Sequence, residues 1–146
     1  MGERMHRGFV GISGLLLVGA LILGACTARS GSGEQSVRVV MDEWNVKPSA
    51  GTVAPGRVSF SAVNQGKEEH ELVVLKTDLA PNALQMRASE DKVDETASAQ
   101  NLGEIEDVEA GKTKTGTFEL PAGRYVLVCN VAGHYRQGMA TSFEVK

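Results

Sequence analysis

Six short runs of β-branched, aromatic and other apolar residues constrain the fold of this chain more than any other feature of its sequence. Segments that contain Pro and Gly separate the runs, which is the pattern of strands joined by turns. The runs span residues 37–46, 57–64, 70–77, 114–120, 124–129 and 140–146. Six or seven short strands in roughly 110 residues predict an all-β domain built as an antiparallel β-sandwich.

Alternation within two of the runs gives the direction of their polar side chains, because successive side chains of a strand point to opposite faces. His70 is in phase with Leu72 and Val74, and Cys129 is in phase with Leu127. Each of these potential metal ligands therefore points the same way as apolar residues of its own strand. The pattern predicts that His70 and Cys129 face the core of the sandwich.

The segment 78–108 interrupts the β pattern. It carries few strand signals, and residues 90–109 contain eight carboxylates, with Lys92 as the single cation. We expect an acidic excursion between strands, with a short helix near 81–88. Two interpretations of its charge remain open: a solvated surface loop, or a docking face for a cationic partner.

The N-terminus has the organisation of a secretory signal. Two arginines and a histidine precede an uncharged, largely apolar run over 8–28, within which small residues come directly before Cys26. This Leu-Gly-Ala-Cys stretch resembles the lipobox of bacterial lipoproteins, which implies cleavage of a signal peptide over 1–25 and acylation of Cys26. The alternative is an uncleaved membrane helix, since the run approaches the roughly 20 residues that a span requires.

Residues 26–36 are polar and rich in Gly and Ser, which predicts a flexible tether before a folded domain over 37–146. The positive charges that precede the apolar run place this domain outside the cytoplasm by the positive-inside rule. We therefore expect a domain that is lipid-anchored to the bacterial cell membrane, on its periplasmic or cell-surface side. With Cys26 acylated, Cys129 is the only thiol of the mature chain.

Charge and residue supply exclude several functions. The chain has 15 Lys and Arg against 18 Asp and Glu, a net charge of -3, so no basic excess is present for binding nucleic acid. Removal of the signal leaves two histidines, too few for the additional copper centres of copper enzymes. No Ser-His-Asp or paired-carboxylate arrangement stands out among the other residues. We expect a protein that is not an enzyme.

One segment concentrates residue types that bind soft metal ions. Cys129, His134 and Met139 follow one another with four residues between each pair, after one predicted strand and before the next. His70 is the remaining imidazole of the mature chain and the candidate for a fourth ligand. Two His, one Cys and one Met form the ligand set of blue-copper electron-transfer sites, whereas Met is not a usual ligand of zinc. The alternative is a structural role, with Cys129 as a small buried apolar residue.

With its C-x4-H-x4-M loop, the chain over 37–146 resembles the cupredoxins, the type 1 blue copper family, and in particular the rusticyanin, sulfocyanin and auracyanin group. Residues 64–70 are similar to the approach to the first ligand in that family. The resemblance implies a Greek-key β-sandwich and one type 1 copper ion. It also implies three equatorial ligands and, last, an axial one: His70, Cys129, His134 and Met139.

The function that the resemblance implies is one-electron transfer by a blue copper protein. With the N-terminal signal, we expect a monomer that acts at the extracytoplasmic membrane surface. A cytochrome or an oxidase-type redox protein would be its partner. His134 would lie nearest the surface, within a rim formed by Val131, Ala132, Gly133 and Tyr135. An envelope copper carrier, chaperone or copper-resistance protein is the alternative function for the same ligands.

One position departs from the family pattern. Many cupredoxins have Asn or Ser after the first His ligand, where it forms a hydrogen bond near the thiolate, and this chain has Glu71. Strand alternation predicts that Glu71 and His70 point to opposite faces. We expect Asn64 or Asn130 to supply the missing hydrogen bond to Cys129.

Overall fold

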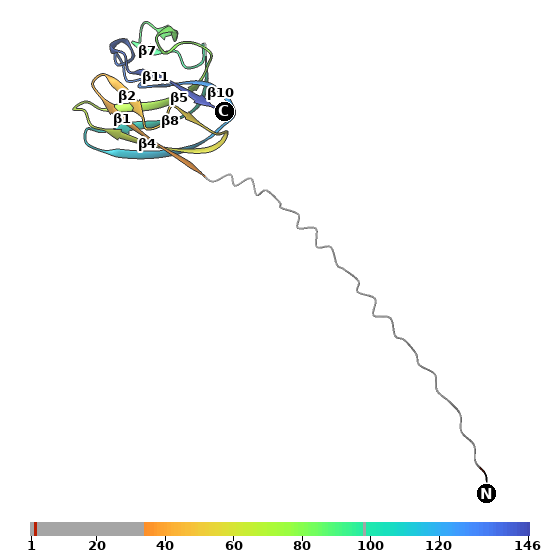
Figure 1. Ribbon diagram of the computed structural model, residues 1–146. Coiled ribbons are helices and arrows are strands. Elements are labelled where there is room, and N and C mark those ends of the chain that lie inside the picture. The colour runs from red at the N-terminus through yellow and green to blue at the C-terminus, as the bar shows by residue number, and fades with distance from the viewer. Residues whose placement is uncertain (1, 3–33, 98) are drawn as a thin grey trace. The chain divides into compact units, whose positions relative to one another are not determined.

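A computed structural model describes residues 2, 34–97 and 99–146 (Figure 1). Two β-sheets form the layers of a sandwich. The four-stranded sheet has the order β2-β1-β4-β9, with bounds Asn45–Pro48, Gln35–Asp42, Gly56–Asn64 and Thr113–Leu120. The five-stranded sheet has the order β3-β11-β10-β5-β8, with bounds Thr52–Val53, Ala140–Val145, Gly123–Val128, His70–Lys76 and Gln100–Val108.

The core between the sheets follows the apolar alternation of the strands. On β4, Val58 and Phe60 are fully buried, whereas Ser59 between them is partly exposed. Val58 and Phe60 pack in one cluster with Leu72 and Leu127 of the other sheet. Because each sheet covers the apolar face of the other, the predicted all-β Greek-key sandwich is confirmed.

Most strand pairs of the sandwich are antiparallel, as predicted, but two are parallel. β1 runs parallel to β4, and β11 runs parallel to β3. The chain leaves the four-stranded sheet for β3 and re-enters it at β4, and such a crossover connection permits a parallel pair. The predicted run 37–46 is also divided, because β1 ends at Asp42 and β2 returns antiparallel from Asn45. β1 begins at Gln35, inside the segment assigned to the tether.

The segment 78–108 contains a strand that the sequence analysis did not predict. β8 spans nine residues at the edge of the five-stranded sheet and pairs with β5, with two register shifts. Ile105 and Val108 are its only buried residues, so the alternation that reveals a strand is absent. Gly103, at φ 150°, lies against the ring of Phe118, where a Cβ atom would clash. An exposed edge strand of this kind leaves little signal in hydrophobic periodicity.

The residues between β5 and β8 cover the outer face of the five-stranded sheet. Leu84 and Val93 are buried there and pack in a second cluster with Val73 and Val126. The helix expected near 81–88 is reduced to one 3-10 turn. The elements of the segment are η1 (Pro81–Ala83), β6 (Met86–Arg87) and β7 (Lys92–Val93), and β6 pairs with β7. The acidic excursion therefore packs against the five-stranded sheet and is not only a solvated loop.

The predicted signal peptide over 1–25, apart from Gly2, lies outside the described residues. So do the acylation site Cys26 and the tether up to residue 33. Within the part of the chain that the structure describes, no helix is both long and apolar enough to cross a membrane.

Candidate metal centre

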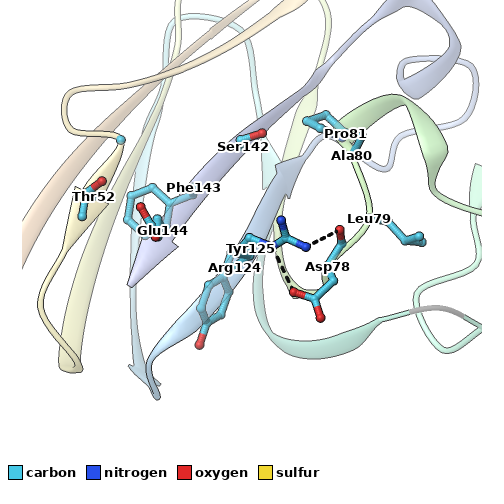
Figure 2. Close-up of a pocket in the computed structure, with 11 residues that line it drawn as sticks. Thr52, Asp78, Leu79, Ala80, Pro81, Arg124, Tyr125, Ser142, Phe143 and Glu144 are labelled. Atoms are coloured by element: carbon cyan, nitrogen blue, oxygen red, sulfur yellow. Dashed lines mark hydrogen bonds and ion pairs between the residues drawn. The ribbon is translucent and has the colours of Figure 1, made fainter. Parts of the chain in front are cut away.

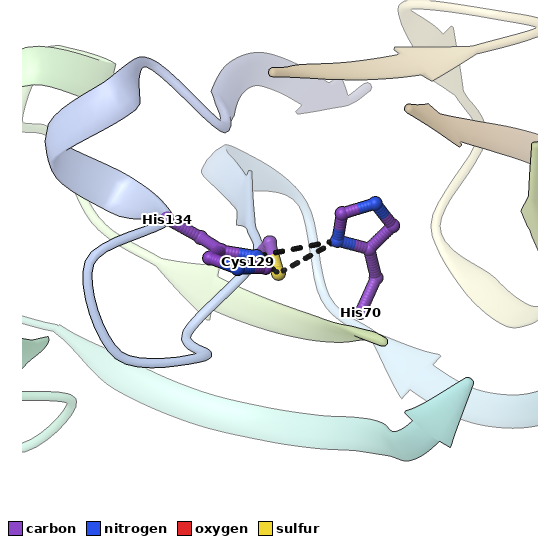
Figure 3. A group of neighbouring side chains, drawn as sticks. All are labelled: His70, Cys129 and His134. Carbon is purple, nitrogen blue, oxygen red and sulfur yellow. Dashed lines mark hydrogen bonds between the residues drawn. The ribbon is translucent and has the colours of Figure 1, made fainter. Parts of the chain in front are cut away.

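Three predicted ligands meet where β5 begins and β10 ends. His70 is the first residue of β5, Cys129 directly follows β10, and these two strands are neighbours in the five-stranded sheet. His134 comes from the 129–139 loop and lies beside both (Figure 3). His70 and Cys129 are 0% exposed and His134 is 5% exposed. The fold thus brings three residues from separate segments into one site that is shielded from water.

The donor atoms of these residues form a nearly equilateral triangle. His70 Nδ1 lies 3.3 Å from His134 Nδ1, and Cys129 Sγ lies 3.7 Å from the first nitrogen and 3.4 Å from the second. The point equidistant from the three atoms is about 2 Å from each, close to the length of bonds from His nitrogen and Cys sulfur to a first-row metal ion. The residues present therefore fit a metal ion with three ligands in one plane.

Main-chain hydrogen bonds place Met139 close to the same residues. Its carbonyl accepts a hydrogen bond from the Cys129 N–H at 2.9 Å, and its own N–H donates to the His134 carbonyl at 3.3 Å. Gly138, at φ 103°, makes the sharp return that this closure requires. The Met139 side chain is fully buried in the core cluster that contains Cys129. The loop thus keeps all three regularly spaced residues at one end of the sandwich.

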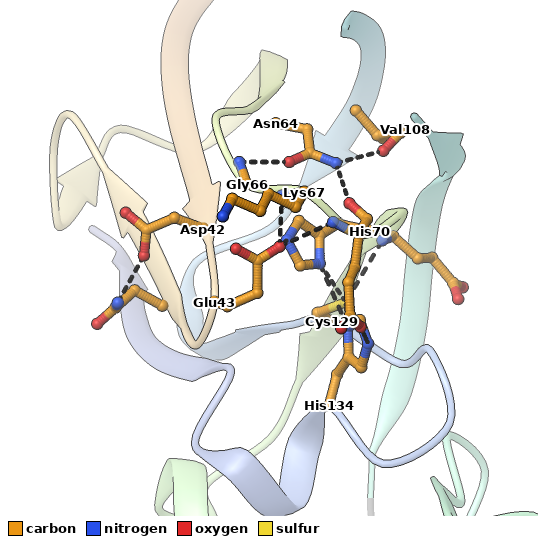
Figure 4. Close-up of polar contacts among 12 residues, drawn as sticks. Asp42, Glu43, Asn64, Gly66, Lys67, His70, Val108, Cys129 and His134 are labelled. Carbon is orange, nitrogen blue, oxygen red and sulfur yellow. Dashed lines mark hydrogen bonds and ion pairs between the residues drawn. The ribbon is translucent and has the colours of Figure 1, made fainter. Parts of the chain in front are cut away.

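The outer ring nitrogens of both histidines face carboxylates that the sequence analysis did not single out (Figure 4). Glu68 Oε2 lies 3.1 Å from His134 Nε2, and Glu43 Oε1 lies 3.6 Å from His70 Nε2. The backbone N–H groups of Lys67 and Glu68 donate to Glu43 at 2.7 and 2.9 Å and hold it there. The hydrogen-bonded Glu68 carboxylate orients the His134 ring and favours the tautomer whose Nδ1 is free to bind a metal, whereas His70 Nε2 lies near Glu43 without a hydrogen bond.

Backbone amides, and not asparagine side chains, approach the sulfur of Cys129. The N–H groups of Glu71 and Val131 donate to Sγ, the first at 3.4 Å. Asn64 donates instead to two backbone carbonyls, one of them at the end of β8, and Asn130 bonds to the main chain of β7. The prediction that one of these asparagines bonds to Cys129 is wrong, because backbone groups already occupy both amides.

A comparison with known families decides what kind of domain this is. The family model described as the sulfocyanin (SoxE) domain matches residues 52–146, which is well over half of the chain. The chain belongs to the sulfocyanin family. This confirms the resemblance to the cupredoxins of the sulfocyanin and auracyanin group. No curated protein sequence matches the chain.

Solved cupredoxin structures share the fold of this sulfocyanin domain. Dithionite-reduced auracyanin from Roseiflexus castenholzii is 20% identical, with a TM-score of 0.58 over 78% of this chain and 99% of that one. Auracyanin A from Chloroflexus aurantiacus, a "blue" copper protein, is 18% identical, with a TM-score of 0.53 over 78% and 100%. An azurin from Methylomonas sp. strain J is 14% identical, with a TM-score of 0.53 over 78% and 99%.

The donor set of this sulfocyanin domain fits one type 1 copper ion. Burial raises the pKa of the Cys129 thiol. Burial, and then the neighbouring His134, lowers the pKa of His70. Both shifts favour neutral side chains in the metal-free site. His70 is therefore ready to bind as a neutral imidazole, whereas Cys129 has to lose a proton when the ion binds.

Residues 84–95, which we call the covering segment, hold the 129–139 loop from outside. The Asn130 side chain is buried at 4% exposure and accepts a hydrogen bond from the Val93 N–H at 2.6 Å. Its amide donates to the Val93 carbonyl at 3.2 Å and to the Glu95 carboxylate at 2.6 Å. The residue directly after Cys129 is thus fixed to β7.

Two further contacts join the covering segment to residues on either side of His134. The Gly133 N–H donates to the Asp91 carbonyl at 2.9 Å, and the Leu84 N–H donates to the Tyr135 hydroxyl at 3.0 Å. Tyr135 is 9% exposed and packs in the second cluster. The prediction that Tyr135 belongs to the surface rim is therefore wrong, because the covering segment lies over it. The other three predicted rim residues are exposed or partly exposed.

The surface pocket in Figure 2 is separate from this centre. Residues of β3, β10, β11 and the loop 78–81 line it, and none of them is a predicted ligand. Arg124 donates to the carboxylate of Asp78 at 3.0 Å and to its carbonyl at 3.1 Å, so these charged groups of the pocket bond to each other. The predicted metal ligands therefore lie at the buried triangle of donor atoms and not in this pocket.

Proposed function

We propose that the chain is a one-electron carrier in which His70, Cys129 and His134 hold a type 1 copper ion and Met139 is its axial ligand. The observation that carries this proposal is the buried triangle of two imidazole nitrogens and one sulfur, with separations of 3.3, 3.4 and 3.7 Å. Thiolate and thioether suit Cu(I), and imidazole also suits Cu(II), so the set serves both oxidation states.

The bound copper supplies a reversible one-electron step between Cu(II) and Cu(I). The chain supplies fixed donors, because β5 holds His70 and the covering segment holds the 129–139 loop on both sides of His134. Donors that keep one arrangement in both oxidation states reorganise little when an electron moves. The three donor residues are at most 5% exposed, which keeps a substrate from reaching the ion and supports a carrier over an enzyme.

The carrier would act as a monomer at the extracytoplasmic surface of the bacterial cell membrane, on the periplasmic or cell-surface side, anchored by lipid on Cys26. The signal-like segment over 1–25 and the small residues before Cys26 support this location. A tether over 26–36 would let the domain reach a cytochrome or an oxidase-type redox partner.

Visible absorption of the copper-loaded protein tests the metal site. We expect an intense thiolate-to-Cu(II) charge-transfer band that a reductant removes and reoxidation restores. Cys129→Ser should abolish this band, whereas the matched variant Cys26→Ser should keep it. A copper-loaded protein without the band, or a Cys129→Ser variant that retains it, would contradict the proposal.

Redox cycling separates an electron carrier from an envelope copper carrier, chaperone or resistance protein. We expect reversible voltammetry in which the protein keeps its copper through repeated cycles in the presence of a Cu(I) chelator. Loss of copper to the chelator at each reduction would favour the copper-delivery function.

Fatty-acid labelling tests the proposed anchor. The full chain, expressed in a bacterium with a lipoprotein pathway, should incorporate labelled palmitate and fractionate with membranes. The Cys26→Ala variant should remain unlabelled. Equal labelling of both proteins would rule out Cys26 as the acylated residue.

A further inference from the structure

Two side chains from other parts of the chain close the route from His134 to solvent. The His134 side chain is 6% exposed, and Glu68 Oε2 lies 3.1 Å from its Nε2. The indole of Trp44 lies edge-on to the imidazole, with ring centroids 5.1 Å apart and an interplanar angle of 74°. The exposed imidazole edge that the family resemblance implies is replaced in this chain by Trp44 and Glu68.

Trp44 connects this closed site to the surface. It lies in the turn between β1 and β2, where it is partly exposed and also packs against the core cluster that contains Cys129. Its ring contacts the imidazole directly, so an electron that passes through it crosses no layer of water. Trp is also one of the residue types enriched at the energetic centres of protein interfaces.

The surroundings of Trp44 are anionic. The turn over 42–47 and the loop over 65–69 contain four carboxylates and two lysines: Asp42, Glu43, Glu68, Glu69, Lys47 and Lys67. The Glu68 side chain is 55% exposed, whereas Lys47 is paired with Asp42 at 3.1 Å. Carboxylates around an aromatic contact favour a partner that presents basic groups there, and they raise the rate of encounter with it.

We propose that Trp44, Glu43 and Glu68 form the docking surface for a redox protein whose cofactor edge is surrounded by lysine or arginine. The electron enters and leaves through the contact between Trp44 and His134. One electron passes from the partner's reduced cofactor to Cu(II), which yields Cu(I) and the oxidised partner. Trp44 itself is neither oxidised nor reduced, and no bond or proton is exchanged. The surface has this role only if the proposed electron transfer takes place.

Electron-transfer kinetics with small probes of opposite charge test this surface. The reduced, copper-loaded protein is oxidised by the cation tris(phenanthroline)cobalt(III) and, separately, by the anion hexacyanoferrate(III). We expect Trp44→Leu to slow both reactions at least about fivefold, with Trp44→Phe in between. Glu68→Gln should lower the ratio of the cationic to the anionic rate and weaken the salt dependence of that ratio, because any change at His134 affects both probes alike whereas the lost charge affects them oppositely. Glu119→Gln, an exposed carboxylate near the far end of β9, is the matched control that should change neither rate.

The visible band shows that each variant is folded and copper-loaded. Wild-type rates in Trp44→Leu protein that has the band would overturn the Trp44 route and leave the proposed electron carrier intact. Absence of the band in the wild-type protein would instead contradict the proposed function. Equal effects of Glu68→Gln and Glu119→Gln on the ratio of the cationic to the anionic rate would overturn the choice of a basic partner.

Fluorescence of the copper-free protein gives a readout that involves no electron transfer. Trp44 is the sole tryptophan of the chain, so quenching by caesium and by iodide reports the charge around it. Relative to N-acetyltryptophanamide, we expect caesium to quench more strongly than iodide. Glu68→Gln should lower that ratio and Glu119→Gln should not. Iodide quenching that matches or exceeds that of caesium on this scale would overturn an anionic docking surface.

Discussion

His70 and the 129–139 loop bring their donor atoms to one site, but different parts of the molecule hold them. His70 opens β5, which has the hydrogen-bonded neighbours β10 and β8 on its two sides. The residues that follow are buried on both faces of the sheet, with Leu72 in the sandwich core and Val73 under the covering segment. The position of His70 is therefore part of the fold itself.

The loop depends instead on contacts from the covering segment. Asn130 bonds to Val93 and Glu95, and the Tyr135 hydroxyl accepts from Leu84. A substitution can remove any one of these contacts and leave both sheets in place. We therefore expect changes in β5 to act on the stability of the whole domain, and changes in the loop contacts to act first on the metal centre.

The strand side of the comparison is tested by Leu72→Ala. Leu72 is fully buried, so truncation should lower the free energy of unfolding of the copper-free protein by about 2–5 kcal/mol. Leu79→Ala is the matched control, because Leu79 is 37% exposed and should change stability by less than about 0.5 kcal/mol. Chemical denaturation measures both. Equal effects of the two variants would show that the packing of β5 does not determine the stability of the domain.

Removal of copper tests whether the ion joins the strand to the loop. Ligands from β5 and from the 129–139 loop meet at one point, so binding should stabilise the folded state by about 2.7 kcal/mol when free copper is 100 times Kd. The melting temperature of wild-type protein should fall when copper is removed. Cys129→Ser should melt at the same temperature with and without copper, and a copper-dependent shift in that variant would place the ion elsewhere.

The loop side is tested by Asn130→Ala. Loss of the amide leaves buried main-chain groups of Val93 without partners, at a cost of about 1–3 kcal/mol. The variant should stay folded but show a shifted charge-transfer band and faster copper release. Asn82→Ala, at an exposed position in η1, provides the control. A spectrum and release rate identical to wild type would show that the covering segment does not set the geometry of the centre.

The last prediction is a pH dependence from Glu71 on the strand side. Burial raises the pKa of Glu71 from 4.5 to about 7. Between these values the folded state binds more protons than the unfolded state, so the free energy of unfolding should fall as pH rises through this window. Glu71→Gln should flatten the decline in copper-free protein, whereas Glu119→Gln, at an exposed position on β9, should not. A decline of unchanged slope in Glu71→Gln would assign it to other groups.

The positions of the candidate ligands could be predicted because their signals are local. Alternation along one strand indicated the direction of His70, and alternation along another indicated that of Cys129. The four-residue spacing placed His134 on one loop with Cys129 and Met139. None of these inferences needs knowledge of which segments meet in the folded chain.

The surroundings of the site could not be predicted in the same way, since they depend on contacts between distant segments. Trp44 and Glu43 belong to a turn that lies inside the single strand predicted over 37–46. Of these carboxylates, Glu68 was easier to predict than Glu43, because it precedes His70 by only two residues. The role of Asn130 depends on β7, whose two residues carry no recognisable strand pattern.

β1 also sets the orientation of the centre. The strand has eight residues, which corresponds to roughly 26 Å of extended chain. Glu34 precedes one end of it, and the turn with Trp44 follows the other. The start of the described domain at Glu34 and the metal centre therefore lie at opposite ends of β1, so a partner bound at Trp44 would sit a full strand length away from Glu34.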